Sequence, residues 1–421
     1  MFYQSPPEKW QNIAREPSNQ LHVIIVGAGL GGLGAAISIL LAGHNVTILE
    51  SALNIGEIGA GIQVLPNSSR ILYSWGLHDM VARHASLPRY CNLMNWKGTQ
   101  LPQIDFYRYN EILGTPFADF HRADLHRSPL DRAIELAANI QVNSRVDNID
   151  YDADGLAATA VLLDKRRLTA DLIVGADGIS SRLREILLEK PDPPSDTGDL
   201  AYRLLINTKD MLADPELQEP IREPRVRYML RGGRLLNMVL IAPDDMPAGS
   251  MTLDGNIEEM KSRFQGWDQK ITKTLRFCRS VHKWKMCIRP SLSQWYHHSG
   301  CLSLLGDAVH ATLPYLASGC GMALEDGAAL GLCLAKLTDK SQSQKIHALK
   351  VYENCRRERT ERVAWVRNPE VVTKPHQELG KDPFPWRYYG VGHWLLTYNV
   401  EKDVNDRWLR SLGMKTSIAR L

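Results

Sequence analysis

The stretch Leu21-His-Val-Ile-Ile-Val26, followed by Gly27-Ala-Gly29-Leu-Gly31-Gly32, decides the fold. The first six residues are apolar and rich in β-branched side chains, which is typical of a buried parallel strand. A helix-like segment, residues 35–42, stops at Gly43, and residues 45–50 have the pattern of a second strand. This strand–helix–strand order predicts an α/β fold with a parallel sheet and a right-handed crossover.

The glycine-rich turn matches the spacing G-x-G-x-x-G at Gly27, Gly29 and Gly32. Glycines at these places let the backbone turn tightly and approach a pyrophosphate, while N–H groups at the helix start face its charge. Glu50 ends the second strand, where it can accept hydrogen bonds from ribose hydroxyls. The structural alternative is a glycine turn that holds no ligand.

Composition excludes several classes of protein. The chain has 421 residues, which suggests two or three domains at about 150 residues each. It is 44% hydrophobic and 23% charged, and 50 Lys and Arg against 47 Asp and Glu give a net charge of +3. This balance does not favour a nucleic-acid partner. No apolar run approaches about 20 residues, so we expect no membrane span.

The cysteines and the beginning of the chain indicate a compartment. Seven cysteines cannot all pair within one chain, and none has C-x-x-C or zinc-ligand spacing. We therefore expect no metal site and a reducing environment. Residues 1–20 are polar and lack the apolar core of a secretory signal. These features together predict a cytoplasmic protein.

Further elements follow along the chain. We expect helices at residues 128–138, 254–281 and 321–337, a strand meander over 140–174 and a buried strand at 301–306. Residues 191–199, rich in Pro and Asp, are expected to be a connector. Beyond them, strands of a second sheet are predicted at 200–207, 225–231 and 234–242, with a hairpin turn at 231–234.

Two acidic turns after strands distinguish FAD from NAD. Asp177-Gly178 follows a strand that begins at Ala170, and Gly306-Asp307 follows the strand at 301–306. The chain then passes Pro314 and reaches Gly319-Cys320-Gly321. An NAD site does not need two such turns far from the glycine loop, whereas FAD bound in extended form spans that distance. Asp307 is placed to hold the ribityl chain, with the flavin ring over residues 314–321.

These residues resemble a known family. The glycine loop, Asp177-Gly178 and Gly306-Asp307 are similar to the motifs of single-component FAD-dependent aromatic hydroxylases, relatives of p-hydroxybenzoate and salicylate hydroxylase. The blocks at 59–67, 120–126 and 306–314 also resemble the family, and most closely its fungal salicylate-hydroxylase-like members. The resemblance covers roughly residues 20 to 400.

The resemblance implies a role for each matching residue. Glu50 and Arg122 would hold the adenosine and pyrophosphate side of FAD, and Ala60-Gly61 would line the cofactor. Asp307 would bind ribityl oxygens, and residues 319–322 would approach the ring. The helix starting near Gly321 would stabilise negative charge on reduced flavin through its N-terminal N–H groups. The cofactor-binding set is therefore Gly27, Gly29, Gly32, Glu50, Ala60, Gly61, Arg122, Asp177, Asp307, Pro314, Gly319, Cys320 and Gly321.

The resemblance also implies an architecture: an α/β, Rossmann-type FAD-binding domain with a second mixed or antiparallel sheet that forms the substrate domain. The predicted domain boundaries are 20–74, 121–190 and 300–366 for the FAD-binding domain, 75–120 and 191–299 for the substrate domain, and 367–421 for a helical, aromatic tail. Whether the protein is a monomer or a homodimer stays open.

The implied activity is an FAD-dependent monooxygenase. It would insert one oxygen atom from O₂ into a small phenolic or other aromatic substrate through a flavin hydroperoxide, with NAD(P)H as a transient co-substrate. One alternative keeps FAD but changes the reaction to epoxidation or oxidative rearrangement of a non-phenolic scaffold. Another is a binding protein that uses the same fold without catalysis, as GDP-dissociation inhibitors do.

Two residues are candidates for activating the substrate. Arg203 opens the second sheet, where related phenol hydroxylases carry an arginine facing the flavin, and it would stabilise a phenolate oxygen. Tyr228, on the strand at 225–231, would hydrogen-bond the same oxygen. Strand alternation is compatible with both side chains pointing inward. The structural alternatives are an arginine with its charge in solvent and a tyrosine that packs.

Overall fold

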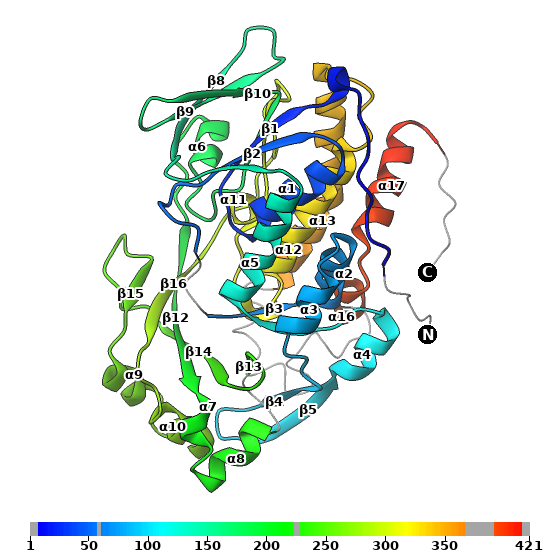
Figure 1. The fold of residues 1–421 in the computed structure, drawn as a ribbon. Helices are drawn as coiled ribbons and strands as arrows, with labels where there is room; N and C mark the ends of the chain where they lie inside the picture. Colours follow the sequence, from blue (N-terminus) through cyan, green and yellow to red (C-terminus); the bar gives the residue numbers. More distant parts are fainter. Residues whose placement is uncertain (1–6, 57–59, 223–227, 367–390, 415–421) are drawn as a thin grey trace.

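The fold is that of a computed structural model, which describes residues 7–56, 60–222, 228–366 and 391–414 (Figure 1). Within them, a five-stranded parallel sheet has the order β17-β11-β1-β2-β7. The predicted strands at 21–26, 45–50 and 301–306 all belong to it, with shorter bounds. Its strands are β1 His22–Val26, β2 Asn45–Leu49, β7 Asn139–Gln141, β11 Leu172–Gly175 and β17 Leu302–Leu304.

Parallel pairing brings one end of each strand to the same edge of this sheet. Val26 pairs with Leu49 on one side and Gly175 on the other, and Gly175 pairs with Leu304. The glycine loop, Glu50 and the two Asp turns all follow these carboxyl ends. The sheet therefore gathers segments separated by up to 280 residues in sequence along one edge, roughly the distance from Gly27 to Asp307.

Helix α1 (Leu30–Leu41) is buried on nearly all sides because it packs between the sheet and α12 (Gly319–Leu334). Small residues allow this close packing. A Cβ at Gly327 would lie 2.5 Å from the backbone nitrogen of Ala35, and one at Gly331 would lie 2.3 Å from Ser38 Cβ. The helix predicted at 321–337 is thus present, shifted by two to three residues. Other helices around this sheet are α5 Arg122–Glu135, α6 Arg182–Leu188, α13 Gln342–Val366 and α17 Val400–Ser411.

The predicted meander over 140–174 is correct for its central part. Strands β8 (Val146–Tyr151), β9 (Ala158–Leu162) and β10 (Arg167–Ala170) form an antiparallel three-stranded sheet. At either end, however, β7 and β11 belong to the parallel sheet. Short apolar runs look alike in both kinds of sheet, so the sequence alone did not separate them.

The second sheet is antiparallel, with the order β13-β14-β12-β16-β15, and lies below the first in Figure 1. The expected connector at 191–199 is partly wrong, since β12 begins at Ser195, where it pairs with Ile288 before a bulge. The single helix expected over 254–281 is two short helices. The elements are β12 Ser195–Asn207, β13 Tyr228–Leu230, β14 Leu235–Pro243, β15 Thr252–Asp254, β16 His282–Ile288, α9 Ile257–Arg263 and α10 Gln269–Leu275.

The two faces of strand β12 have different surroundings. Tyr202, Leu204 and Ile206 join an apolar cluster that includes Met260 of α9 and Leu275 of α10. Side chains alternate along a strand, so Ala201 and Arg203 project from the opposite face. The second sheet therefore has its own core on one side. On the other side Ala201 packs with Met286 and Leu313, and Arg203 lines a cavity.

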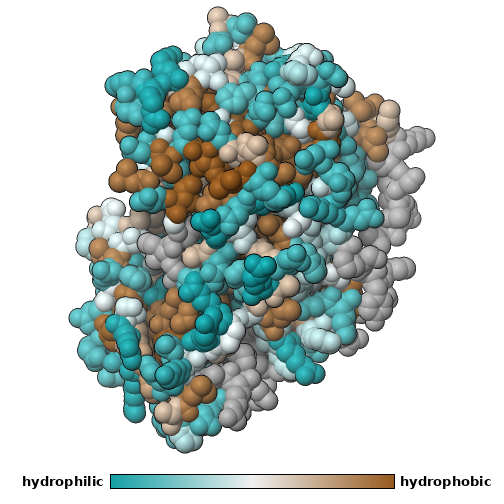
Figure 2. Space-filling model, in the orientation of Figure 1, coloured by the Kyte–Doolittle hydropathy of each residue, from teal (hydrophilic) through white to brown (hydrophobic). Residues whose placement is uncertain are grey.

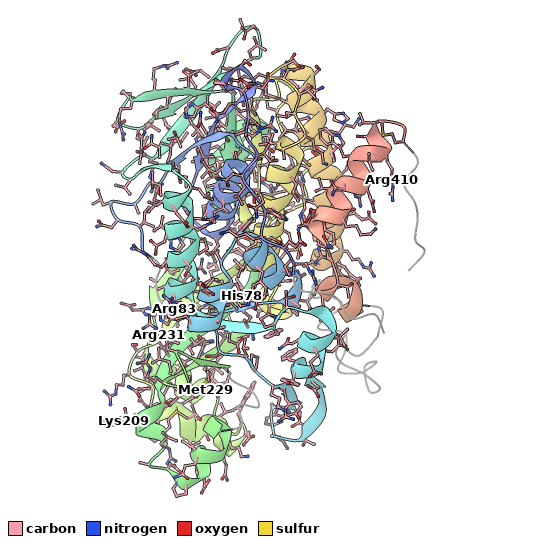
Figure 3. The ribbon with its side chains drawn as sticks, turned by 45° about the vertical axis from the view of Figure 1, so that its right-hand side comes forward. His78, Arg83, Lys209, Met229, Arg231 and Arg410 are labelled. Atoms are coloured by element: carbon pink, nitrogen blue, oxygen red, sulfur yellow. The ribbon has the colours of Figure 1, made fainter. Side chains whose placement is uncertain are left out.

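A small antiparallel ribbon joins the two parts. Strand β3 (Gly61–Val64) pairs with β6 (Ala118–His121), β3 contacts α12, and β6 contacts β13 of the second sheet. Asp124 of α5 also forms a bidentate ion pair with Arg231 in the β13–β14 turn, at 2.8 and 2.9 Å. Arg231 is labelled in Figure 3, close to the lower end of α5.

The remaining described elements lie mostly around this ribbon and at the ends of the chain. The predicted tail is described for residues 391–414, where it forms two helices, and the rest of it lies outside the described residues. These elements are α2 Pro66–Ser74, α3 His78–His84, β4 Tyr90–Met94, β5 Gln100–Asp105, α4 Phe106–Leu113, α7 Thr208–Met211, α8 Pro215–Arg222, α11 Asp307–His310, α16 Val391–Leu396 and the 3₁₀ helices Pro17–Asn19 and Pro314–Leu316.

The surface mixes hydrophilic and hydrophobic residues, as Figure 2 shows for one face. Exposed apolar side chains include Val142 and Leu163, which are 40% and 53% exposed. Among the described residues, no helix combines the length and the apolar character needed to cross a membrane.

Candidate active site

The three motif glycines have three different physical roles. Gly27 has φ +108°, and a Cβ there would lie 2.4 Å from Ala176 O. A Cβ at Gly32 would lie 2.0 Å from Gly27 O, so Gly32 lets the helix pack against the loop. A Cβ at Gly29 would meet no atom within 4 Å and would project into open space. At Gly29 the loop therefore exposes backbone atoms, without a side chain, to the adjoining open space.

Two cavities meet at this loop. The large cavity has a volume of about 510 Å³ and the small cavity about 310 Å³, and both are lined by Gly29, Ala176 and Gly178. Predicted residues in the wall of the large cavity are Gly29, Gly61, Arg122, Arg203, Asp307, Pro314, Gly319 and Cys320. Those in the wall of the small cavity are Gly27, Gly29, Glu50 and Asp177.

Four predicted residues are not in either wall. Gly32 packs behind the loop, and Gly321 faces α2, where a Cβ would lie 2.4 Å from Ser68 Oγ. Ala60 is buried, and its carbonyl accepts the N–H of Arg122 at 2.8 Å. The backbone of Tyr228 pairs with Asn237, while its side chain lies outside the described part of the structure.

Glu50 is held firmly beside the glycine loop. One carboxylate oxygen accepts the N–H of Ala28 at 2.9 Å, and the other accepts the N–H of Ala52 at 2.8 Å and the hydroxyl of Ser51 at 3.1 Å. The side chain is half-buried and lines the small cavity. It thus fixes the loop and has further acceptor capacity at the wall of the small cavity.

Asp177 acts mainly on the neighbouring helix. Its carboxylate accepts the hydroxyl of Ser181 at 2.6 Å and the N–H groups of Arg182 and Leu183 at 2.7 and 3.1 Å, at the start of α6. Burial raises the pKa of Asp177, and these hydrogen bonds act in the opposite direction. The adjacent Gly178 lines both cavities, and a Cβ there would meet no atom within 4 Å.

Asp307 is exposed in the large cavity, and its loop is fixed from behind. Gly306 has φ +62°, and its N–H donates to Asp326 Oδ2 at 2.8 Å. Asp326 is fully buried in α12 and also contacts His310 Nε2 at 2.5 Å and Arg356 Nε at 2.7 Å. The buried carboxylate of Asp326 therefore positions the loop that carries the cavity-lining carboxylate of Asp307.

The neighbouring Glu325 extends this buried ion network. Arg359 donates to both of its oxygens at 2.7 and 2.8 Å, and Asn67 Nδ2 lies 2.6 Å from Oε1. Burial acts to raise the pKa of Glu325, but Arg359 and Arg356 outweigh it and lower that pKa. Two adjacent acidic residues in an apolar helix were the sequence signal for this network.

The start of α12 forms one wall of the large cavity through Ser318, Gly319, Cys320 and Ala323. A Cβ at Gly319 would meet no atom within 4 Å. Since the first N–H groups of a helix lack intrahelical partners, this wall favours an anionic or electron-rich group. The helix begins at Gly319 rather than near Gly321, where the sequence predicted its start.

Arg203 lies on the opposite wall, contributed by the second sheet. Its guanidinium carbon is 4.5 Å from the ring centroid of Trp284 on β16, so the indole supports it through a cation–π contact. Val239 and Ile241 of β14 line the cavity beside it. The arrangement is a cation within an otherwise largely apolar wall.

Sequence reasoning missed several residues of this wall, including Gln63, Val239, Ile241 and Thr312. Val239 and Ile241 follow the alternation of β14, which indicates one face of the strand but not what that face covers. Gln63 lies in a block that resembles the family, yet nothing in its local spacing distinguished it.

The fold and the two joined cavities fit a protein that binds a dinucleotide cofactor. The chain belongs to the FAD binding domain family, whose profile matches residues 20–366. The open glycine positions and the acidic side chains near both ends of the site fit FAD. FAD is thus the cofactor of this protein.

Two relatives and one solved structure refine this assignment. The FAD-dependent monooxygenase OpS4 of Beauveria bassiana (strain ARSEF 2860) is 38% identical over 369 residues, which cover 83% of this chain and 84% of that protein. The 3-hydroxybenzoate 6-hydroxylase of Klebsiella oxytoca is 32% identical over 354 residues, 82% of this chain and 86% of that protein. A salicylate hydroxylase substrate complex shares the fold, with a TM-score of 0.76 and 20% identity over 92% of this chain and 98% of that one. The protein is a flavoprotein monooxygenase, not a binding protein without catalysis.

Proposed function

We propose that this monooxygenase inserts one oxygen atom from O₂ into a phenolic or other aromatic substrate, with NAD(P)H as the reductant. The observation that carries the proposal is Arg203, held over Trp284 in an apolar wall that faces the start of α12. An aromatic ring fits between apolar side chains, and a fixed cation favours the ionised form of its hydroxyl group.

The cofactor would extend through both cavities. Glu50 would hold the ribose, Arg122 the pyrophosphate, and Asp307 the ribityl chain, with the ring against residues 318–320. When bound, FAD supplies the redox chemistry, accepting a hydride from NAD(P)H and activating O₂. The first N–H groups of α12 would stabilise negative charge on the reduced ring.

The substrate would lie between that ring and the second sheet. Arg203 would hold the phenolate oxygen, and Val239 and Ile241 would exclude water from the reacting carbon. Tyr228 stays a candidate for the same oxygen, on a strand paired with β14. The phenolate makes its ring carbons electron-rich, which is the state that accepts an electrophilic oxygen atom.

The test combines three measurements on the purified flavoprotein. NADH and NADPH oxidation, O₂ consumption and hydroxylated product are followed with salicylate, 3-hydroxybenzoate and a wider panel of phenols. We expect at least one phenol to accelerate coenzyme oxidation and to gain one oxygen atom. Coenzyme oxidation that yields peroxide and no hydroxylated product with every phenol would contradict the proposal, whereas an oxygenated non-phenolic substrate would redirect it to another substrate class.

A further inference from the structure

One glutamine in the wall of the large cavity is held by a buried carboxyl group. Gln63 of β3 and Asp119 of β6 lie directly opposite each other in the antiparallel ribbon. Gln63 is half-buried and lines the cavity, whereas Asp119 is 1% exposed. Gln63 Nε2 donates to Asp119 Oδ1 at 2.8 Å. The two side chains thus form a cross-strand pair with one member in the cavity wall and the other behind it.

Burial of the Asp119 carboxyl group is energetically unfavourable. Within the part of the chain that the structure describes, no lysine, arginine or histidine forms an ion pair with Asp119, and Gln63 is its side-chain donor. Burial raises the pKa of Asp119 to about 8, and the bond from Gln63 acts in the opposite direction. Burying a carboxyl group with few hydrogen-bond partners costs free energy, and its presence calls for a role at a neighbouring residue. The neighbour here is a cavity residue.

The role of Asp119 follows from the chemistry of the two ends of the Gln63 amide. A primary amide has a donor NH₂ and an acceptor oxygen. One N–H of Nε2 donates to Asp119, which fixes the orientation of the amide and leaves the oxygen Oε1 at its other end as the acceptor for a molecule in the cavity. The cavity wall then carries a hydrogen-bond acceptor at Gln63 and a donor cation at Arg203.

We propose that Gln63 is a specificity residue that accepts a hydrogen bond from a second O–H or N–H substituent of the aromatic substrate, and that Asp119 is the positioning residue that orients it. This inference rests on the proposed hydroxylation. It assigns the substrate class as aromatic rings with one oxygen for Arg203 and a separate hydroxyl or amino donor for Gln63.

The test uses pairs of probes that differ by one donor. Catechol is compared with its monomethyl ether, and resorcinol with its monomethyl ether, since methylation removes the second O–H and keeps the first. The KM, the kcat and the dissociation constant from the flavin absorbance change are measured for wild type, Gln63→Leu, Asp119→Leu and Asp119→Asn. Gln344→Leu on α13, a half-buried glutamine outside both cavities, is the control.

We expect wild type and Gln344→Leu to favour the diol over its ether. Gln63→Leu should raise the KM for the diol about three- to tenfold, the range of one neutral hydrogen bond, and leave the ether and kcat little changed. Asp119→Leu should reproduce this loss. Asp119→Asn keeps an acceptor for Gln63 Nε2 and should restore the wild-type preference. The ratio between diol and ether separates this role from a merely structural one, because a loss of packing alone would affect both probes alike.

The outcomes separate the two proposals. An equal diol-to-ether ratio in wild type and Gln63→Leu would overturn the role of Gln63. A wild-type ratio in Asp119→Leu beside a lost ratio in Gln63→Leu would overturn the role of Asp119 alone. No binding or turnover of any probe would overturn the substrate class, and absence of product from every phenol in the wider panel would overturn the proposed function. Flavin content checks folding, and Asp119→Ala replaces Asp119→Leu if that variant does not fold.

Discussion

Asp326 of α12 accepts the backbone N–H of Gly306 at 2.8 Å, immediately before the carboxylate of Asp307 enters the large cavity. A buried acid thereby fixes the loop that carries an exposed acid. The same Asp326 contacts Arg356 and His310, so the position of the cavity-facing turn depends on a buried ion network behind it.

Asp326→Asn should destabilise the fold and loosen flavin together. Removing one member of a buried ion pair leaves Arg356 without a full counter-charge, which costs about 3–5 kcal/mol. Denaturant unfolding and flavin content after dialysis measure the two effects. Asp131→Asn breaks an exposed pair with Arg127 and should change stability by less than about 1 kcal/mol. Equal effects of the two variants would contradict the role given to the network.

Glu50→Ala and Asp307→Ala should each weaken FAD binding about ten- to a hundredfold. Each variant removes a carboxylate acceptor worth about 1.5–3 kcal/mol. Equilibrium dialysis with fluorescence of free FAD measures the change. Asp150→Ala removes an exposed carboxylate on β8 that pairs with Arg167 and serves as the control. Full flavin retention in both site variants would refute the proposed positions of ribose and ribityl chain.

Gly319→Val should impair flavin seating without straining the backbone. Gly319 has no positive φ, and an added side chain would project into the large cavity because no atom lies within 4 Å of its Cβ position. Gly56→Val, with equally open space at an exposed position, is the matched control. Gly155 is buried with φ +66°, so a substitution there would strain the backbone and it is unsuitable as a control. The flavin content and the rate of flavin reduction are measured for both variants. Equal values in Gly319→Val and Gly56→Val would contradict a place for Gly319 beside the flavin.

Arg203→Ala should uncouple the reaction. The residues proposed to hold FAD are Glu50, Arg122 and Asp307, so flavin content should stay normal while product falls and coenzyme oxidation releases peroxide. Arg203→Lys should not restore coupling, since an ammonium does not reproduce the planar stacking on Trp284. Trp284→Leu should lower coupling in the same direction. Unchanged product per coenzyme oxidised in Arg203→Ala would move the activating role to another residue.

The free energy of unfolding of Asp119→Asn should increase relative to that of wild type as pH rises. The carboxyl has a pKa of about 8 in the fold and an ordinary value of 3.8 when unfolded. Between these values the folded state binds more protons, so wild-type stability falls with rising pH relative to the variant. His121, Asp124 and Arg231 interact with one another nearby and are common to both proteins. Denaturant unfolding of both proteins at about pH 5 and about pH 9 measures this difference, and a constant difference would contradict the buried acid.

The sequence predicted the parts of the site that depend on local order along the chain. The glycine loop, Glu50 and Asp307 each follow a strand directly, and parallel pairing is enough to bring such positions to one edge. Arg203 was found because it opens a strand of alternating pattern and because the resemblance placed it near the flavin. The structure places Arg203 in the wall of the large cavity, and its position relative to the flavin stays a prediction.

The missed features depend on pairing between distant segments. Gln63 and Asp119 are 56 residues apart, and their contact exists because β3 and β6 happen to share a register. The start of β12 at Ser195 depends on pairing with Ile288. The roles of Gly32 and Gly321 in packing, outside the cavity walls, likewise depend on what lies across from them. The local sequence around a residue does not show which distant residue it will contact.

The two faces of β12 have a consequence for how this enzyme can diversify. Tyr202 and Leu204 belong to the apolar cluster beneath α9 and α10, whereas Arg203 between them belongs to the cavity. Exchanges at the cavity-facing positions of β12 and β14 therefore leave that cluster intact. Selection can revise which molecules are oxidised while the stability of the second sheet is inherited unchanged, which makes this sheet a ready target for directed evolution.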